Sequence, residues 1–307
     1  MAHKGKVYLI GAGPGAVAYL TVQAYQLLRQ AEVIVYDALV DPRILELAPE
    51  SCLRLDVGKR GGQPSPAQGA IDRLLVAQCQ QQKRVVRLKS GDPFIYGRAL
   101  SEIQALHRAG CEFEVVPGLS SALAAPLLAG IPLTDPNLSP GFAVFSAHDP
   151  AALDWQSLAQ LDTLVLLMGG QHLPEIVAQL QQQGRSPQFP IAVIRRGGWA
   201  DQQVWRGCLN DIIAQTAGQA LSPAVIVIGE VVQVQLPTVA QEQAMPPLLH
   251  IPPWQAMLPS SAAQPARALA SQEIQPLQGP LAGKTILVTR AAGQSPEFSD
   301  RLQQQGA

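Results

Sequence analysis

A glycine-rich loop follows the first apolar run of the chain. Residues 7–10 read Val-Tyr-Leu-Ile, and residues 11–16 read Gly-Ala-Gly-Pro-Gly-Ala. This loop matches the G-x-G-x-x-[GA] pattern of dinucleotide sites, in which glycines let backbone N–H groups approach a pyrophosphate. Asp37 ends the second apolar run, where such a site positions the carboxylate that binds ribose. The loop therefore predicts a site for a dinucleotide or for another adenosyl-bearing ligand.

The position of the next helix argues against the dinucleotide. In a dinucleotide site the helix begins at the glycines, so that its first N–H groups face the phosphates. Here Thr21 is the first good N-cap, and five residues separate it from Gly15. Both kinds of ligand stay open on these residues alone.

Three further apolar runs end in loops of small and polar residues. Such loops expose backbone groups that a ligand can bind. Ordinary turn chemistry explains any one of them, whereas four strand ends of this kind together predict a ligand cradle built largely from backbone. The three loops are residues 90–93, 117–121 and 168–170.

Strands and helices must alternate to bring these loops together. The apolar runs have the length of strands, and the segments between them place apolar residues at helical spacing. This alternation predicts a parallel α/β sheet. We expect strands at 7–10, 33–36, 85–88 and 113–116, and helices after Thr21, over 66–82 and over 97–110.

A second set of apolar runs follows at shorter spacing. The short connections predict a mixed sheet in an α+β domain. The expected fold class is α/β with two domains that share a cleft, where ligands commonly bind. We expect the strands of this second domain at 142–146, 163–167, 191–195 and 224–232, with one helix over 173–184.

The predicted domain boundaries come from changes in composition. The N-terminal domain covers residues 1–132 and the C-terminal domain covers residues 133–235. Residues 236–280 are rich in Pro, Ala and Gln without a sustained period, which predicts a linker. Residues 281–307 read as one strand and one helix, too little to bury a core, so we expect the truncated start of a third domain.

Composition narrows the class of protein. A net charge of −1 gives no global attraction to nucleic acid or to an anionic membrane. The four cysteines form no C-x-x-C pair and the five histidines are scattered, so we expect neither a disulfide framework nor a metal site. Unpaired thiols suit the cytoplasm. No apolar run reaches the roughly 18 residues of a membrane span.

The order of the motifs resembles a known family. "YLIGAGPG", "VYDALV", "VGKR", "VVRLKSGDPFIYGR", "VVPGLSSA", "AGIPLT" and "LLMGG" are similar to the tetrapyrrole methylases, and within that family to the uroporphyrinogen-III C-methyltransferases. The resemblance spans residues 6 to 232. The segment "LAGKTILVTRAAGQSPEFSDRLQQQGA" resembles the first strand and helix of uroporphyrinogen-III synthase, which makes the substrate of such a methylase.

The resemblance implies an activity. It implies two methyl transfers from S-adenosylmethionine to uroporphyrinogen III, which give precorrin-2 for sirohaem or cobalamin synthesis, by a cytoplasmic homodimer fused to a synthase domain. Two alternatives stay open: a methylase of a later precorrin, and a degenerate domain that binds tetrapyrrole for the fused synthase. Departures from the family pattern leave this choice open, and they fall at Ala16, Ser90, Asp135 and Pro136 and in "GRALSE".

The resemblance also implies roles for individual residues. Asp37 and Lys59 take acid–base roles, although Asp37 could instead cap a loop and Lys59 could pair with substrate carboxylates. Because the acceptor carries eight carboxylates, basic residues beside the loops are expected to bind substrate, and these are Arg60, Lys89 and Arg98. The implied cofactor-binding residues are Pro14, Ser90, Gly91, Asp92, Ile95, Ser120, Ser121, Met168 and Gly197.

Overall fold

The computed structural model describes residues 5–58 and 67–234. Lys59 and Arg60 lie outside the described residues, as do the predicted linker at 236–280 and the predicted synthase-like segment at 281–307.

The first half of the described chain forms a parallel five-stranded sheet with the order β3-β2-β4-β1-β5. The four predicted strands are present. A fifth strand, β3, was not predicted, because at the edge of the sheet it is mostly exposed and lacks a continuous apolar run. The strands are β1 (Lys6–Gly11), β2 (Val33–Tyr36), β3 (Leu53–Asp56), β4 (Arg84–Lys89) and β5 (Glu112–Val116).

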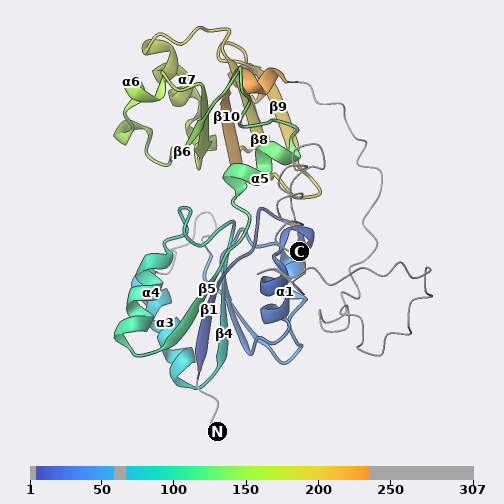
Figure 1. Ribbon diagram of the computed structural model, residues 1–307, viewed down its shortest axis with the longest axis vertical. Coiled ribbons are helices and arrows are strands. Elements are labelled where there is room, and N and C mark those ends of the chain that lie inside the picture. The colour runs from blue at the N-terminus through green and yellow to red at the C-terminus, as the bar shows by residue number, and fades with distance from the viewer. Residues whose placement is uncertain (1–4, 59–66, 235–307) are drawn as a thin grey trace, which may run out of the picture. The chain divides into compact units, whose positions relative to one another are not determined.

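Helices cover both faces of this sheet (Figure 1). Strand β1 shows why, because Val7 and Leu9 pack with α3 and α4 on one face while Ile10 packs with α1 and α2 on the other. Alternate residues of a strand point to opposite faces, so an apolar run covered on both sides needs two helical layers. The helices are α1 (Val22–Leu28), α2 (Pro42–Leu45), α3 (Gln68–Gln80) and α4 (Ala99–Arg108), with a 3₁₀ helix, η1, at Val17–Tyr19.

The second half forms a mixed five-stranded sheet with the order β6-β7-β10-β8-β9. Only β6 and β7 run parallel; the other pairs are antiparallel. Edge strand β9 was not predicted, because its exposed and half-exposed residues form neither a continuous apolar run nor a regular alternation. The predicted strand over 224–232 ends at Gly229, and a 3₁₀ helix, η4 (Glu230–Gln233), follows. The strands are β6 (Phe142–Ser146), β7 (Thr163–Leu167), β8 (Pro190–Arg195), β9 (Gln203–Cys208) and β10 (Ala224–Gly229).

Helix α5 packs against the second sheet rather than the first. Its residues Ala122 and Ala125 share a buried cluster with Val165, Ile194 and Val227. The predicted boundary at residue 132 falls after this helix, whereas the packing changes from one sheet to the other between β5 and α5. The helices here are α5 (Ser121–Leu128), α6 (Trp155–Leu158), α7 (Leu173–Gln182) and α8 (Ile212–Gln215), with 3₁₀ helices η2 (Pro150–Ala152) and η3 (Gly170–His172).

The fold is therefore α/β, with one parallel and one mixed sheet. Within residues 5–58 and 67–234, no helix combines the length and the apolar composition needed to cross a bilayer. The same ranges hold no cluster of three or more metal-ligating side chains.

Candidate functional site

Three predicted loops meet at the carboxyl edge of the first sheet. The glycine loop after β1 pairs with the loop after β4, because Gly13 N–H donates to Gly91 O over 3.2 Å and Gly91 N–H donates to Gly13 O over 2.8 Å. The loop after β5 joins them through Gly118, whose N–H donates to Asp92 Oδ2 over 3.2 Å. Ligands of open α/β sheets bind at this edge.

Glycine at two of these positions permits the close approach of backbones. A Cβ on Gly118 would lie 2.3 Å from Gly91 O, and a Cβ on Gly11 would lie 2.6 Å from Gly118 Cα. Real Cβ atoms do not come this close to backbone, so both positions need glycine. The three loops can therefore pack together only if the first residue of the "GAGPG" motif is glycine. This requirement does not depend on binding a pyrophosphate.

Asp92 shapes its own turn. Its Oδ1 accepts from Phe94 N–H over 2.9 Å, and its Oδ2 accepts from Gly118 N–H. Both carboxylate oxygens therefore bind backbone N–H groups. The carboxylate thus shapes the turn, and the cofactor contact that the resemblance implies for Asp92 stays a prediction. Ile95 follows in the same turn, and its side chain is exposed.

The start of α5 completes this edge. Ser120 is the N-cap, and its Oγ accepts from Ala122 N–H over 3.3 Å. Ser121 is the first helical residue, whose N–H has no partner inside a helix. A Cβ on Gly91 would lie 3.7 Å from Ser121 N, so the lack of a side chain at Gly91 leaves space near this donor. The predicted residues Ser90, Gly91, Ser120 and Ser121 are thus brought together.

Gly197 approaches the same edge from the second sheet. A Cβ on Gly197 would lie 2.5 Å from the Cβ of Ala125 in α5. The next residue, Gly198, accepts from Ala16 N–H over 3.0 Å, which places the turn after β8 against the glycine loop of Pro14. Pro14 and Gly197 therefore lie on contacting segments of the two halves.

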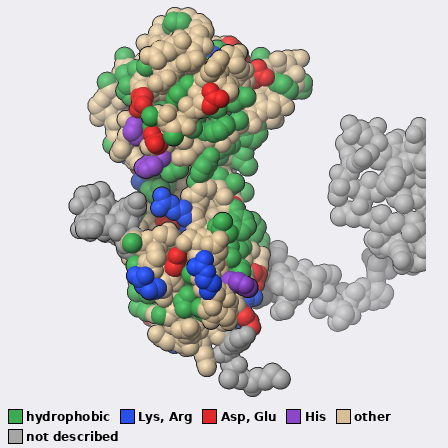
Figure 2. Space-filling view, turned by 90° about the vertical axis from the view of Figure 1, so that its left-hand side faces the viewer, with side chains coloured by type: hydrophobic (Ala, Val, Ile, Leu, Met, Phe, Trp, Pro, Cys, Tyr) green, Lys and Arg blue, Asp and Glu red, His purple; other side chains and the backbone are tan. Residues whose placement is uncertain are grey.

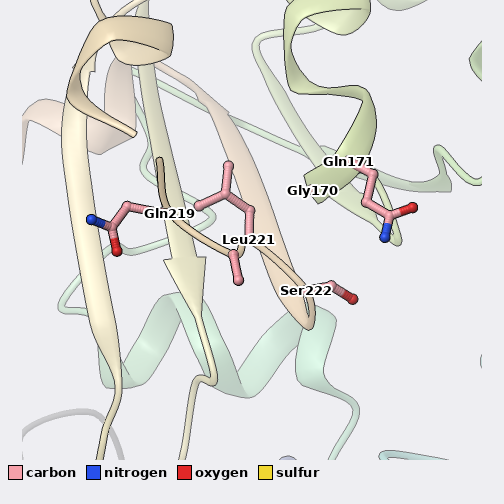
Figure 3. Close-up of a pocket in the computed structure, with 6 residues that line it drawn as sticks. Gly170, Gln171, Gln219, Leu221 and Ser222 are labelled. Atoms are coloured by element: carbon pink, nitrogen blue, oxygen red, sulfur yellow. The ribbon is translucent and has the colours of Figure 1, made fainter. Parts of the chain in front are cut away.

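Met168 directly follows strand β7 and is 48% exposed. Two residues further along the chain, Gly170 borders a pocket of about 300 Å³. Gly170 and Gln171 line one part of this pocket, and residues 219–222 line the other. Figure 3 shows Leu221 in the middle of the labelled residues, with Gln219 to one side and Gln171 to the other. The contacts that join the three loops do not include Met168, so the structure places it on the second sheet without linking it to them.

Asp37 follows β2 at the same edge of the first sheet, where a buried arginine holds it. Arg87 Nη2 lies 2.6 Å from Asp37 Oδ1, and Arg87 Nε lies 2.9 Å from Glu102 Oε1. Lys89 Nζ also contacts Glu102, at 2.8 Å. Arg87, Lys89 and Glu102 are at most 3% exposed, whereas Asp37 is 32% exposed. Two cations and two carboxylates thus balance in one network that reaches solvent at Asp37.

Burial and charge act in opposite directions on the two cations. For Arg87, burial lowers the pKa, but the carboxylates of Asp37 and Glu102 outweigh burial and hold the pKa above its usual value. For Lys89, burial and the charge of Arg87 lower the pKa, and the attraction of Glu102 does not offset them.

The position of Lys89 corrects the prediction that it binds substrate. Its side chain is 2% exposed, and its ammonium contacts both carboxylate oxygens of Glu102, at 2.8 and 2.9 Å. A buried, paired ammonium has no access to a carboxylate from solvent. Alternation along β4 explains the error, since the strand turns Lys89 and Arg87 to the same covered face.

Arg98 remains accessible. It is exposed, precedes α4 and has a left-handed backbone with φ of 55°. Two arginines at the end of β8 are instead engaged within the protein: Arg195 donates to Ala220 O over 2.8 Å, and Arg196 pairs with Asp201 over 2.7 Å. Figure 2 shows separate Lys and Arg side chains over the first sheet, with acidic side chains among them rather than one continuous basic surface.

Sequence reasoning missed Arg87 and Glu102 as parts of the site. A signal was present, because the run "VVRLK" places two cations two residues apart in an otherwise apolar strand. A buried charge requires a partner, so this pattern calls for a carboxylate on the covering helix. Glu102 lies in the stretch "GRALSE", within the helix predicted over 97–110; it lies inside α4 and is buried.

Comparisons with known proteins agree with this geometry. The family model for Tetrapyrrole (Corrin/Porphyrin) Methylases matches residues 6–213. A uroporphyrinogen-III C-methyltransferase from Synechococcus elongatus is 58% identical over 231 residues, which cover 75% of this chain and 95% of that protein. A siroheme synthase from Sodalis glossinidius is 48% identical over 234 residues, and the match covers 75% of this chain but 50% of the synthase. The chain thus spans about half the length of that relative.

Solved structures give the same fold. A uroporphyrin-III C-methyl transferase from Thermus thermophilus, complexed with S-adenyl homocysteine, superposes with a TM-score of 0.64 at 38% identity, covering 74% of this chain and 99% of that one. A cobalt precorrin-4 methyltransferase superposes with a TM-score of 0.67 at 26% identity, covering 75% of this chain and 96% of that one.

Proposed function

The chain belongs to the tetrapyrrole methylase family, and we propose that it transfers two methyl groups from S-adenosylmethionine to uroporphyrinogen III, which gives precorrin-2. The observation that carries this proposal is the identity to the Synechococcus methyltransferase along nearly the whole of that protein. This identity favours uroporphyrinogen III over a later precorrin, and an enzyme over a binding module. Precorrin-2 serves sirohaem or cobalamin synthesis.

The loops at the carboxyl edge fit an adenosyl cofactor. The space that a Cβ on Gly91 would fill lies 3.7 Å from Ser121 N, which leaves room for a polar ligand atom near that donor. We assign cofactor contacts to the backbone of the glycine loop, to the two loops that meet it, to the turn after β8 and to the end of β7. The bound sulfonium supplies the activated methyl group, so the protein mainly has to align donor and acceptor. The residues are Pro14, Ser90, Gly91, Asp92, Ile95, Ser120, Ser121, Met168 and Gly197.

Asp37 accepts the proton that leaves the macrocycle after methyl transfer. Its carboxylate is partly exposed at the edge where the loops meet, and Arg87 holds it at 2.6 Å. A charged hydrogen bond of this kind fixes the orientation of the carboxylate. Lys59 stays a proposed proton donor, and Arg60 and Arg98 stay proposed partners of the substrate carboxylates; of these three, the described ranges contain Arg98.

The proposal extends to the setting of the enzyme. We propose a homodimer in the cytoplasm, with residues 281–307 as the start of a fused uroporphyrinogen-III synthase domain. All four cysteines carry free thiols, which supports a reducing compartment. The resemblance of the C-terminal segment to the synthase supports the fusion, since the synthase makes the substrate that the methylase uses.

A single-turnover assay tests the function. The protein is mixed with methyl-labelled S-adenosylmethionine and enzymatically generated uroporphyrinogen III, beside an Asp37→Ala variant. We expect label in the tetrapyrrole, reduced by about 100-fold or more in the variant, as for the loss of a general base. Binding of S-adenosylhomocysteine without any transfer of label by the unaltered protein would overturn the methyltransferase assignment in favour of a binding module.

A further inference from the structure

The turn between β8 and β9 holds the glycine loop through two hydrogen bonds. The indole Nε1–H of Trp199 donates to Pro14 O over 3.0 Å, and Ala16 N–H donates to Gly198 O, also over 3.0 Å. The first contact joins residues that are 185 positions apart in the chain. The two bonds flank Gly15, so the loop is fixed on both sides of that residue.

Two glycines allow this contact to form. A Cβ on Gly15 would lie 2.7 Å from both Gly198 O and Trp199 Cδ1, which no folded structure tolerates without a shift. A Cβ on Gly198 would lie 3.0 Å from Pro14 Cγ, and Gly198 has a φ of +86°, which favours glycine. Loop and turn are therefore in direct contact, with no room for a side chain between them.

The indole of Trp199 is held in one orientation. The guanidinium of Arg196 lies 4.1 Å from the centre of the indole ring and pairs with Asp201 over 2.7 Å. The backbone of the turn is closed by Trp199 N–H, which donates to Arg196 O, and by Gly198 N–H, which donates to Gln202 Oε1. Because the ring of Trp199 is stacked and its N–H is bonded, the indole has little conformational entropy left to lose when it holds the loop.

We propose that Trp199 is a positioning residue for the cofactor site, which sets the place of Pro14 relative to Gly197. This inference rests on the proposed function, which assigns these two residues to S-adenosylmethionine from opposite halves of the chain. Gly197 is two residues before Trp199, and Pro14 supplies the carbonyl that Trp199 binds. Trp199 acts through that carbonyl, so it tunes the affinity for the cofactor and leaves the chemistry of methyl transfer to other groups.

The variant Trp199→Phe tests this inference. Phenylalanine keeps an aromatic ring under Arg196 and removes the N–H donor. Loss of one such hydrogen bond predicts a Kd for S-adenosylhomocysteine that is about five- to tenfold higher, by calorimetry. We expect the KM for S-adenosylmethionine to rise by the same factor, while kcat and the KM for uroporphyrinogen III stay within about twofold. Trp205→Phe, in β9 of the same hairpin, is the matched control and leaves all these constants unchanged.

A second variant disrupts the same contact in another way. Gly15→Ala pushes the loop from Gly198 O, and we expect it to weaken S-adenosylhomocysteine binding at least as much as Trp199→Phe. If the unaltered protein binds S-adenosylhomocysteine and both variants bind it equally well, the positioning role is wrong and the proposed function stands. If the unaltered protein does not bind S-adenosylhomocysteine, the proposed function fails and the inference falls with it. An equal drop in kcat and in affinity for both substrates would also overturn it, as the mark of a general structural role.

Discussion

Arg87 Nη2 lies 2.6 Å from Asp37 Oδ1, and this contact joins a buried charge network to the edge of the sheet where the predicted loops meet. The other side of the same guanidinium binds Glu102, so Arg87 cannot turn away from Asp37 without breaking a second ion pair. A planar guanidinium held at both ends is a rigid donor. The orientation of Asp37 is therefore set by residues that never reach solvent.

Replacing Arg87 tests this relationship. In Arg87→Met the carboxylate of Asp37 loses its donor, and we expect kcat for methyl transfer to fall about tenfold or more while the Kd for S-adenosylhomocysteine changes little. Arg87→Lys keeps the charge but not the two-ended contact, and we expect an intermediate kcat. Arg84→Met, at the half-exposed start of the same strand, is the control. A loss of cofactor affinity as large as the loss of kcat would contradict the prediction.

We predict that replacing Glu102 strongly lowers the unfolding free energy. It is fully buried between Arg87 and Lys89. In Glu102→Gln two buried cations lose their shared carboxylate, and breaking a buried pair costs about 3–5 kcal/mol of unfolding free energy. Chemical denaturation measures this loss directly.

The matched control for this variant is Glu32→Gln. Glu32 pairs with Lys83 at 3.7 Å, and both side chains are about half exposed. Exposed pairs contribute under about 1 kcal/mol, so the two variants should differ several-fold in their effect. Equal losses would mean that burial of the Glu102 network does not govern its contribution.

Much of the fold could be predicted from apolar periodicity, and the failures have a common physical cause. All eight predicted strands are present, because each lies inside a sheet or is covered on one or both faces. The two strands that were missed, β3 and β9, are edge strands, but so are β5 and β6, which were predicted. What β3 and β9 lack is a continuous apolar run, because their residues are exposed or half-exposed, and the apolar run is the feature that periodicity detects.

The candidate site could be predicted where backbone makes it and not where side chains do. Glycine, proline and serine at strand ends marked the three loops that meet around Gly118. By contrast, Lys89 was assigned to the substrate and is buried, and its partner Glu102, inside the helix predicted over 97–110, was given no role. Sequence spacing within β4 shows which residues share a face, but not whether a helix from elsewhere in the chain covers that face.

We predict that replacing Gly118 weakens cofactor binding. In Gly118→Ala the added Cβ would lie 2.3 Å from Gly91 O, so the loops after β4 and β5 must separate. We expect the Kd for S-adenosylhomocysteine to rise more than about tenfold, as measured by calorimetry. Gly141→Ala is the control, because a Cβ on Gly141 meets nothing within 4 Å and should leave the Kd unchanged. Unchanged affinity in Gly118→Ala would show that the close approach of these loops does not shape the cofactor site.

We predict that the contribution of Lys89 to the unfolding free energy depends on pH. Burial lowers its pKa in the folded protein below 10.5, the ordinary value that the unfolded chain keeps. Between these two values the unfolded chain binds more protons than the folded protein, so the contribution of Lys89 to the unfolding free energy rises with pH. Below the folded pKa both states are protonated and this contribution is constant.

The comparison with Lys89→Met isolates that contribution. We expect the difference in unfolding free energy, unaltered protein minus Lys89→Met, to increase as the pH is raised through the window below 10.5 and to be flat at neutral pH. Lys83→Met, which removes a lysine that is 44% exposed, is measured beside it. Denaturation curves at a series of pH values measure both differences. A difference for Lys89→Met that falls with rising pH would mean that the attraction of Glu102 outweighs burial and holds the ammonium charged, because the folded protein would then keep its proton longer than the unfolded chain.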